Sequence, residues 1–179
     1  MLADDVFIPG IPLQVSEITR KARLEASQGD PEPVRDGSNR PTSDDPFLWQ
    51  RKEAWSRATE EDVAAFDMHS WLAGPGDWIA YRLEQPTQIR TVTLVLDSNL
   101  ERGLKHPSVA QSLPPSLPNQ FRVEILKHQE WELLSHCRNN TQRLVIIPVN
   151  QCTTGVRLVV EETHGHEQTR LYGLYLSQV

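Results

Sequence analysis

The sequence predicts an all-β domain, an antiparallel β-sandwich whose loops gather at the ends of the strands. After Trp71 the chain divides into short segments in which apolar and polar residues alternate, and no long helical pattern interrupts them. Ahead of these segments, a strand-like stretch at residues 22–27 leads into a polar loop that contains the turn pair Asp36-Gly37. A sandwich of this kind displays loops and carries no fixed chemistry of its own.

Residues 1–19 are predicted to form an extended arm. The segment from Phe7 to Leu13 is apolar, but it contains Pro9 and Pro12, which remove backbone donors and forbid a helix. Extended apolar residues of this kind pack along a neighbouring surface, either the flank of this domain or a partner domain. The sandwich domain itself is then expected to span residues 20–179.

A long polar loop and one short helix are predicted before the main strands. Residues 30–45 are rich in Pro, Asp, Ser, Asn and Gly, which is typical of a loop. Further on, Thr59 precedes three acidic residues and the apolar run at 63–66. A hydroxyl that caps the first amides, followed by acids at the positive end, indicates a short inserted helix.

Strands are predicted where apolar residues recur at every second position. Val92, Leu94 and Leu96 share one face, whereas Thr91 and Thr93 share the other, which is the pattern of a half-buried strand. Alternation of this kind, or a short apolar run bounded by turns, marks about eight strands, at residues 22–27, 78–83, 89–96, 121–125, 131–134, 143–149, 156–160 and 171–176. Two stacked layers of these strands are expected to share an interior that includes Val92, Leu94, Val123, Trp131 and Leu158.

The five tryptophans divide by context. Trp78 and Trp131 begin strands, where a place in the core is expected, and Trp71 is expected to pack one end of the sandwich. Trp49 and Trp55 lie in a polar segment beside hydrogen-bonding side chains. An apolar ring with polar neighbours suits a sugar, but it also suits a protein interface or a staple that fixes the inserted helix to the sandwich.

Charge and segment lengths exclude two classes of partner. The 24 acidic residues outnumber the 18 Lys and Arg, giving a formal charge of -6. We therefore expect no binding to nucleic acid, because a phosphate backbone requires a basic face. No apolar stretch approaches the ~18 residues of a membrane helix, and the N-terminus lacks the pattern of a secretory signal. We expect no membrane contact and favour the cytoplasm.

The two cysteines point to the same compartment. Cys137 and Cys152 lie near the ends of two neighbouring predicted strands, so one disulfide between them is conceivable. Two cysteines do not make a disulfide framework, however, and free thiols in a reducing cytosol are the favoured interpretation.

Several short motifs, in order, resemble the galactose-binding-like β-sandwich of discoidin or coagulation factor 5/8 type C domains. The resemblance covers about residues 20–179 and rests on Ala26-Ser27, Asp36-Gly37, Trp71, Trp78-Ile79, Pro86, Ile89, Val92, Phe121-Arg122-Val123-Glu124, Trp131, Arg157-Leu158 and Arg170-Leu171-Tyr172. More narrowly, the runs at 96–100, 139–143 and 153–158 resemble the C-terminal sandwich domain of bacterial FAD-dependent oxidoreductases.

This resemblance implies an eight-stranded antiparallel jelly roll with ligand loops at one end, and an accessory role. It also implies a calcium site, because discoidin-like domains hold the ion with an aspartate in the position of Asp36, nearby carbonyl oxygens and a glutamate. That glutamate would fall at Gly173, and calcium requires six to eight oxygens. The alternative is that Asp36-Gly37 forms a tight turn in which the carboxylate accepts backbone amides.

No catalytic residues are predicted. The chain has no Gly-x-Gly-x-x-Gly after a strand and no βαβ unit, so any FAD chemistry would lie outside it. His164 and His166 lack a third ligand at metal spacing. Glu161 and Glu162 are adjacent on a strand and point to opposite faces, so they cannot act together as acid and base.

Three functions follow, in order of preference. The first is a non-catalytic accessory domain at the C-terminus of an FAD-dependent oxidoreductase, which docks on an upstream catalytic domain or another protein surface and shapes substrate access. The second is a free-standing carbohydrate-binding module with loop contacts from Arg40, Trp49, Trp55, Asn99, Arg102 and His106. The third is a small hydrolase, which would require His and carboxylate side chains to converge.

Overall fold

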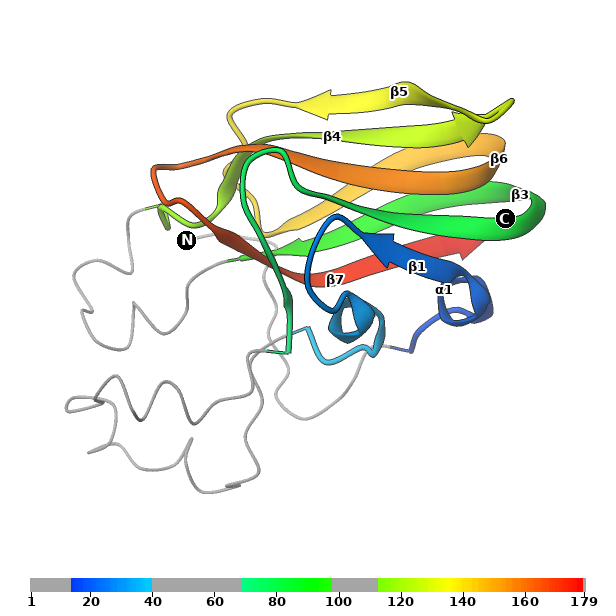
Figure 1. The fold of residues 1–179 in the computed structure, drawn as a ribbon, viewed down its shortest axis with the longest axis horizontal. Helices are drawn as coiled ribbons and strands as arrows, with labels where there is room; N and C mark the ends of the chain where they lie inside the picture. The colour runs from blue at the N-terminus through cyan, green and yellow to red at the C-terminus, as the bar shows by residue number, and fades with distance from the viewer. Residues whose placement is uncertain (1–13, 40–68, 98–112, 179) are drawn as a thin grey trace, which may run out of the picture.

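The computed structural model describes residues 14–39, 69–97 and 113–178, and these form an antiparallel β-sandwich with very few helical residues (Figure 1). The predicted all-β class is confirmed. In chain order the described elements are α1 (Glu17–Lys21), β1 (Arg23–Ala26), the 3-10 helix η1 (Glu32–Arg35), β2 (Trp71–Ala73), β3 (Trp78–Leu96), β4 (Pro118–Lys127), β5 (Glu130–Cys137), β6 (Leu144–Thr163) and β7 (Thr169–Gln178).

Strands β3 and β6 each span two of the predicted strands. The expected turn at 84–87 is a bend inside β3, and the stretches predicted as two strands at 143–149 and 156–160 are both part of β6. The two long strands stay paired with each other on both sides of the bend, with a shift of register between Arg82 and Thr87. Four predicted strands therefore merge into two, and the short β2 brings the total described to seven.

The bend carries β3 and β6 from one layer of the sandwich into the other. The strand order is β2-β7-β3-β6-β4-β5, and β1 pairs with the first part of β3. One layer therefore contains β1, the first half of β3, the second half of β6, β4 and β5. The other layer contains β2, β7, the second half of β3 and the first half of β6 (Figure 1).

The core lies between the two layers and is built from the alternating residues that the sequence singled out. Val92, Leu94, Val123 and Leu158 are all at most 1% exposed, as predicted. Trp131 is not in this core and is only half-buried. It pairs with Leu126 on β4, whose neighbour Ile125 points inward, so Leu126 and Trp131 both point to the outer surface.

Trp71 packs one end of the sandwich, as predicted. Its side chain is 1% exposed, and its indole nitrogen donates a hydrogen bond to the backbone oxygen of Gln28 at 2.7 Å. Burial of the ring together with a partner for its only polar atom is the favourable arrangement for a tryptophan. The contact ties the polar loop after β1 to β2.

Helix α1 occupies part of the predicted arm. Ser16 caps it by accepting the Thr19 amide and donates its hydroxyl to the backbone oxygen of Leu176 at 2.6 Å. The buried Thr19 hydroxyl accepts the Leu176 amide at 2.9 Å, which docks the helix on β7. Residues 17–19 are thus helical rather than extended. Residues 1–13 and the predicted inserted helix lie outside the described residues.

Among the described helices none is both long and apolar enough to cross a membrane.

Both cysteines are free thiols: Cys137 is half-buried at the end of β5, and Cys152 is exposed beside the bend of β6. Burial raises the pKa of the Cys137 thiol above its ordinary value.

Two leucines on opposite surfaces of the same layer test this placement of the core. Leu158→Ala should lower the free energy of unfolding by about 2–5 kcal/mol, because it empties space in a close-packed interior. Leu133→Ala, at a side chain that is 61% exposed, should stay within about 0.5 kcal/mol of the wild type. Urea unfolding followed by circular dichroism measures both. Equal losses in the two variants would contradict the described core.

Candidate functional site

All six residues predicted to contact a ligand lie outside the described residues. Arg40, Trp49 and Trp55 fall in the segment 40–68, and the other three fall in the segment 98–112 (Asn99, Arg102 and His106). The structure does describe the residues that flank these two segments on both sides. Those flanking residues show whether the two segments belong to the same end of the sandwich.

The starts of both segments are joined by the guanidinium group of Arg143. This side chain is 4% exposed at the beginning of the β6 region. It donates one hydrogen bond to the backbone oxygen of Asn39 at 2.6 Å and another to that of Leu96 at 3.3 Å. The Leu96 amide in turn donates to the Arg143 backbone oxygen at 2.8 Å. The segments that begin after Asn39 and Asp97 therefore leave the sandwich from one small region.

The two ends of the first segment also meet. The carboxylate of Asp36 contacts the Nε2 atom of His69, so the chain just before residue 40 and the chain just after residue 68 lie side by side. The other Asp36 oxygen accepts the Ser38 amide at 2.8 Å. This contact is of the kind expected for the tight turn that the sequence offered as the alternative to a calcium site.

Further connections close the same end of the sandwich. The His164 amide donates to the Leu117 backbone oxygen at 3.1 Å, which brings the β6–β7 turn next to the chain that follows residue 112. His164 Nε2 lies 2.6 Å from the backbone oxygen of Asn140, in the turn after β5. His164 is thus engaged in joining turns. Among the described residues, no group of three or more His, Cys, Asp or Glu is placed to hold a metal ion.

The described residues do not fit the calcium site that the resemblance implied. A glutamate at position 173 would have to displace two side chains, because even a Cβ atom there would lie 2.5 Å from the Tyr175 ring and 2.6 Å from Asn39 Oδ1. Both oxygens of Asp36 already have partners. The Asn39 backbone oxygen accepts from Arg143. Oxygens that an ion would need are therefore used within the chain.

Tyr175 supplies a further contact to the same loop. Its hydroxyl donates to Asn39 Oδ1. Burial raises the pKa of Tyr175, and the negative charge of Asp36 raises it further. The phenol therefore stays protonated throughout the physiological range and remains a hydrogen-bond donor. Asn39 is held from two sides, by Arg143 through its backbone and by Tyr175 through its side chain.

A second surface gathers polar and aromatic side chains on the outer face of the layer that contains β4 and β5. Its residues stand in rows across the strands because cross-strand partners point to the same side. The rows are Trp78, Val159, Arg122 and His136, then Glu25, Ala80, Arg157, Glu124 and Leu133, then Arg23, Arg82, Gly155, Leu126 and Trp131.

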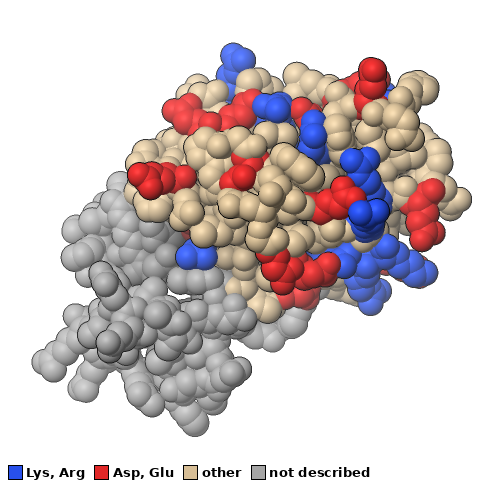
Figure 2. Space-filling view, in the orientation of Figure 1, with Lys and Arg blue, Asp and Glu red and all other residues tan. Residues whose placement is uncertain are grey.

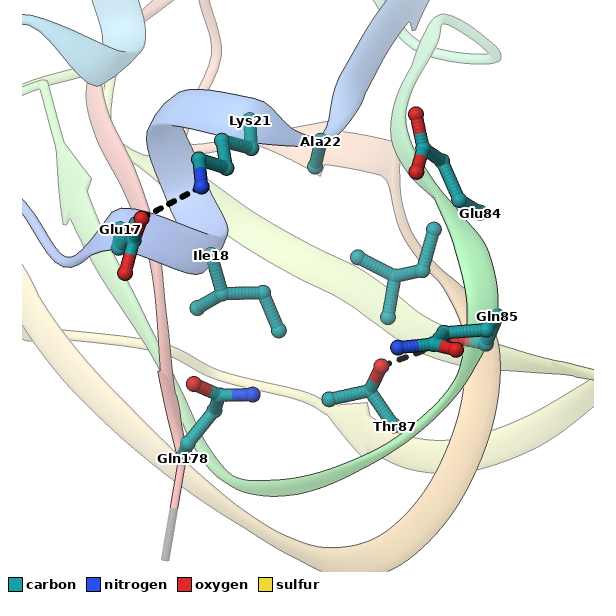
Figure 3. A pocket seen from close by; sticks show the side chains of 9 residues that line it. Glu17, Ile18, Lys21, Ala22, Glu84, Gln85, Thr87 and Gln178 are labelled. Atoms are coloured by element: carbon teal, nitrogen blue, oxygen red, sulfur yellow. Dashed lines mark hydrogen bonds and ion pairs between the residues drawn. The ribbon is translucent and has the colours of Figure 1, made fainter.

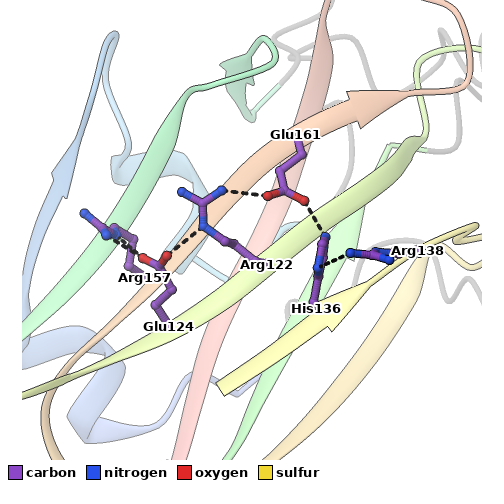
Figure 4. A network of polar contacts seen from close by, with 6 residues as sticks. All are labelled: Arg122, Glu124, His136, Arg138, Arg157 and Glu161. Atoms are coloured by element: carbon purple, nitrogen blue, oxygen red, sulfur yellow. Dashed lines mark hydrogen bonds and ion pairs between the residues drawn. The ribbon is translucent and has the colours of Figure 1, made fainter. Parts of the chain in front are cut away.

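The charged members of this outer face pair with one another (Figure 4). Glu124, whose side chain is 9% exposed, accepts hydrogen bonds from Arg122 at 2.7 Å and from Arg157 at 2.6 Å. Arg122 also donates to Glu161 at 2.6 Å, and Glu161 lies 2.6 Å from His136 Nε2. In this half-buried network the carboxylates are paired with arginine and histidine side chains. We interpret it as a structural link between β4, β5 and β6.

The tryptophans of the outer face stack with this network rather than with the core. The guanidinium carbon of Arg157 lies 4.5 Å from the Trp131 ring centre and 6.0 Å from that of Trp78. Trp131 also packs over Gly155, where an added Cβ would lie 3.2 Å from the indole ring. The prediction that Trp78 and Trp131 are core residues is therefore wrong. Each is half-buried, in cation–π contact with arginine.

The face of the molecule in Figure 2 agrees with this pairing. Acidic and basic side chains of the described residues are mixed there, and neither sign forms a broad patch. A mixed surface has no long-range field that would favour one charged polymer.

One pocket, of about 480 Å³, lies at the opposite end of the sandwich, between α1 and the bend of β3 (Figure 3). Ile18 and Leu83 line it together with polar side chains, among them Thr87 and Gln178. None of the described residues that line it is aromatic, so it offers no ring on which a sugar could stack. It is remote in the fold from the end where the two loop segments begin.

The residues that organise the loop end were not singled out as a site by the sequence. Arg143 belongs to a run that contributed to the family resemblance, and Asn39 belongs to the predicted polar loop. Nothing in the sequence pattern indicated that the two residues are in contact. The only sequence signal for Arg143 is a charged residue at the start of an apolar strand. His69 and Tyr175 likewise carried no signal of their own.

The carboxylate network generates a pH prediction. Burial raises the pKa of Glu161, but hydrogen bonds from Arg122 and His136 outweigh this effect and leave the pKa below its ordinary value of 4.5. A carboxylate with a lowered pKa stabilises the folded state above its unfolded pKa, and this stabilisation is lost as the pH falls through the folded pKa. The gap in unfolding free energy between wild type and Glu161→Gln should be widest near neutral pH and shrink below about pH 4.5.

Urea unfolding across a pH series measures that gap. The matched control is Glu162→Gln, which removes the adjacent carboxylate on the other face of β6, where it accepts a hydrogen bond from Gln120. This variant should follow the wild-type acid unfolding closely. A gap for Glu161→Gln that does not change with pH would rule out the assigned role of its charge.

Comparisons with known proteins give a match by structure only. No protein family matches the chain by sequence profile, and no curated protein matches it by sequence. The family 32 carbohydrate-binding module from Streptococcus pneumoniae EndoD superposes with a TM-score of 0.58 and 16% identity, over 92% of this chain and 100% of that one.

Two further solved structures show the same likeness. A module named GH31 CBM32-2, bound to GalNAc, has a TM-score of 0.55 and 11% identity over 88% of this chain and 99% of that one. The module CpGH89CBM32-6, produced by Clostridium perfringens, has a TM-score of 0.53 and 12% identity over 88% and 94%. At these identities the likeness establishes the fold alone, which is the discoidin-like, galactose-binding-like β-sandwich seen in family 32 carbohydrate-binding modules.

Proposed function

We propose that this chain is a carbohydrate-binding module that holds a glycan at the end of the sandwich where the segments 40–68 and 98–112 begin. The observation that carries the proposal is the pair of hydrogen bonds from Arg143 to the backbone oxygens of Asn39 and Leu96. They bring the starts of both segments together. The six predicted contact residues are all within these two segments, so one shared site can draw on both.

The chemistry of the two segments suits a sugar. A pyranose ring presents an apolar face, which stacks on an aromatic side chain, and a rim of hydroxyl groups, which require donors and acceptors. Trp49 and Trp55 offer the first. The donors and acceptors for the rim would come from Arg40, Asn99, Arg102 and His106. We infer a glycan that ends in a galactose-type sugar, since one solved module of the same fold is bound to GalNAc.

The proposal gives the chain a binding role without catalysis. Among the described residues, the titratable side chains of the outer face pair with one another, and His164 at the loop end joins turns. The comparisons give no support to the expected origin in an FAD-dependent oxidoreductase.

Binding of a glycan array by the full chain, followed by calorimetry with galactose, GalNAc and glucose, tests the proposal. We expect the chain to bind galactose-type sugars. Replacing the stacking tryptophan, by Trp49→Ala or Trp55→Ala, should weaken binding by about 30-fold, since a central aromatic anchor contributes about 2 kcal/mol or more.

Trp131→Ala is the matched control, because it removes a tryptophan from the outer face of the sheet, away from the loop end. It should leave the affinity unchanged while circular dichroism confirms that the variant is folded. Failure of the wild-type chain to bind any glycan on the array would overturn the proposal and favour docking on a protein partner. An equal loss with Trp131→Ala would place the site on the sheet face instead.

A further inference from the structure

We propose that Arg143 is a built-in cation that holds the loop end together, in the role that the sequence resemblance implied for a calcium ion, so that the chain folds and keeps its loop without metal. The inference rests on contacts between described residues only. It does not depend on the proposed glycan site.

The contacts of Arg143 are those of a bound cation. Its guanidinium gathers the backbone oxygens of Asn39 and Leu96, at 2.6 and 3.3 Å, from two segments that are distant in sequence. Its other side faces the ring of Tyr172, with 5.8 Å from the guanidinium carbon to the ring centre. A guanidinium stays protonated at every physiological pH and presents several donors in a fixed plane, so it can join carbonyl groups as a metal ion joins its oxygen ligands.

Burial makes this charge important for the loop. Arg143 is 4% exposed, and a buried charge is stable only when polar groups surround it. The carbonyl groups of Asn39 and Leu96 provide part of that surrounding, and the aromatic face of Tyr172 provides more. Removing the charge would therefore leave carbonyl oxygens without their donor at the point where the two segments begin.

Gly173 stands where the resemblance would place a glutamate ligand, and its neighbours occupy the space that a glutamate side chain would need. Gly173 packs against Tyr175, whose hydroxyl takes Asn39 Oδ1 as its acceptor. A side chain at 173 would displace both groups. The arrangement of Gly173, Tyr175 and Asn39 is therefore a substitute for the acidic ligand rather than a gap that a metal could fill.

The carboxylate of Asp36, the residue that the resemblance offered as a calcium ligand, is also committed. Asp36 accepts the Ser38 amide and contacts His69, which closes the turn from within the chain. A divalent ion in this loop would compete with these donors and would be repelled by the guanidinium of Arg143. Charge and geometry thus both disfavour a divalent ion beside Asp36.

Thermal unfolding of the full chain in calcium and in EDTA tests the proposal directly. We expect the two melting temperatures to agree within about 1 °C, since an ion that does not bind the folded state cannot shift its unfolding. A stabilisation of several degrees by millimolar calcium would overturn the proposal. This comparison needs no variant, so it stands even if substitutions at 143 prevent folding.

Variants then test the role of the charge itself. Arg143→Met keeps an unbranched apolar stem but removes the charge and the donors, and should lower the melting temperature by at least about 5 °C. Arg143→Lys keeps the charge without the planar set of donors, and should fall between Arg143→Met and the wild type. The matched control Arg90→Met, at an exposed arginine on β3, should change the melting temperature by less than about 2 °C.

Two outcomes separate the proposal from a merely structural arginine. Arg143→Met as stable as Arg90→Met would overturn it. Arg143→Lys no more stable than Arg143→Met would also overturn it, because the retained charge would then contribute nothing at the loop end. None of these readouts uses a glycan, so their outcome is independent of whether the module binds sugar.

Discussion

The continuous pairing of β3 with β6 is the constraint on which the rest of the structure depends. Both strands bend at the same place and remain hydrogen-bonded on either side of the bend, so each belongs to both layers of the sandwich. The other strands attach to this pair: β1 and β4 on one layer, β7 on the other. Because both strands return to the end from which they start, the beginning of β3 and its end at Leu96 lie at the same side of the molecule. The loop end is a consequence of that path.

Alternation in the sequence was sufficient to predict the layers, and insufficient to say which side of a layer is covered. Val92, Leu94, Val123 and Leu158 were placed correctly because every second residue of their runs is apolar and each has a polar residue on at least one side. Trp78 and Trp131 were misplaced because their aromatic character suggested burial. Their cross-strand partners, Val159 and Leu126, point outward, and the indole rings find their apolar contact on arginine and on the bare backbone of Gly155.

The candidate site could be predicted only at the level of segments. Composition marked 30–45 as a loop, and Trp49 and Trp55, in a polar segment beyond it, suggested a sugar. Which loops meet is a matter of contacts between residues far apart in the chain, and no local pattern encodes the hydrogen bond from Arg143 to Asn39. Whether the loop residues suit a calcium ion could not be judged from the sequence for a related reason. A single aspartate matched the family, but the crowding of Gly173 by Tyr175 is visible only in three dimensions.

The two cysteines of this fold differ in a way that has a practical consequence. A thiolate is the reactive form, and burial holds the Cys137 thiol protonated, whereas Cys152 is exposed beside the bend of β6. A thiol-directed reagent at neutral pH would therefore attach at Cys152 first. That position is at the opposite end from Asn39 and Leu96, so a chain coupled to a solid support through this sulfur would present its loop end to the solution.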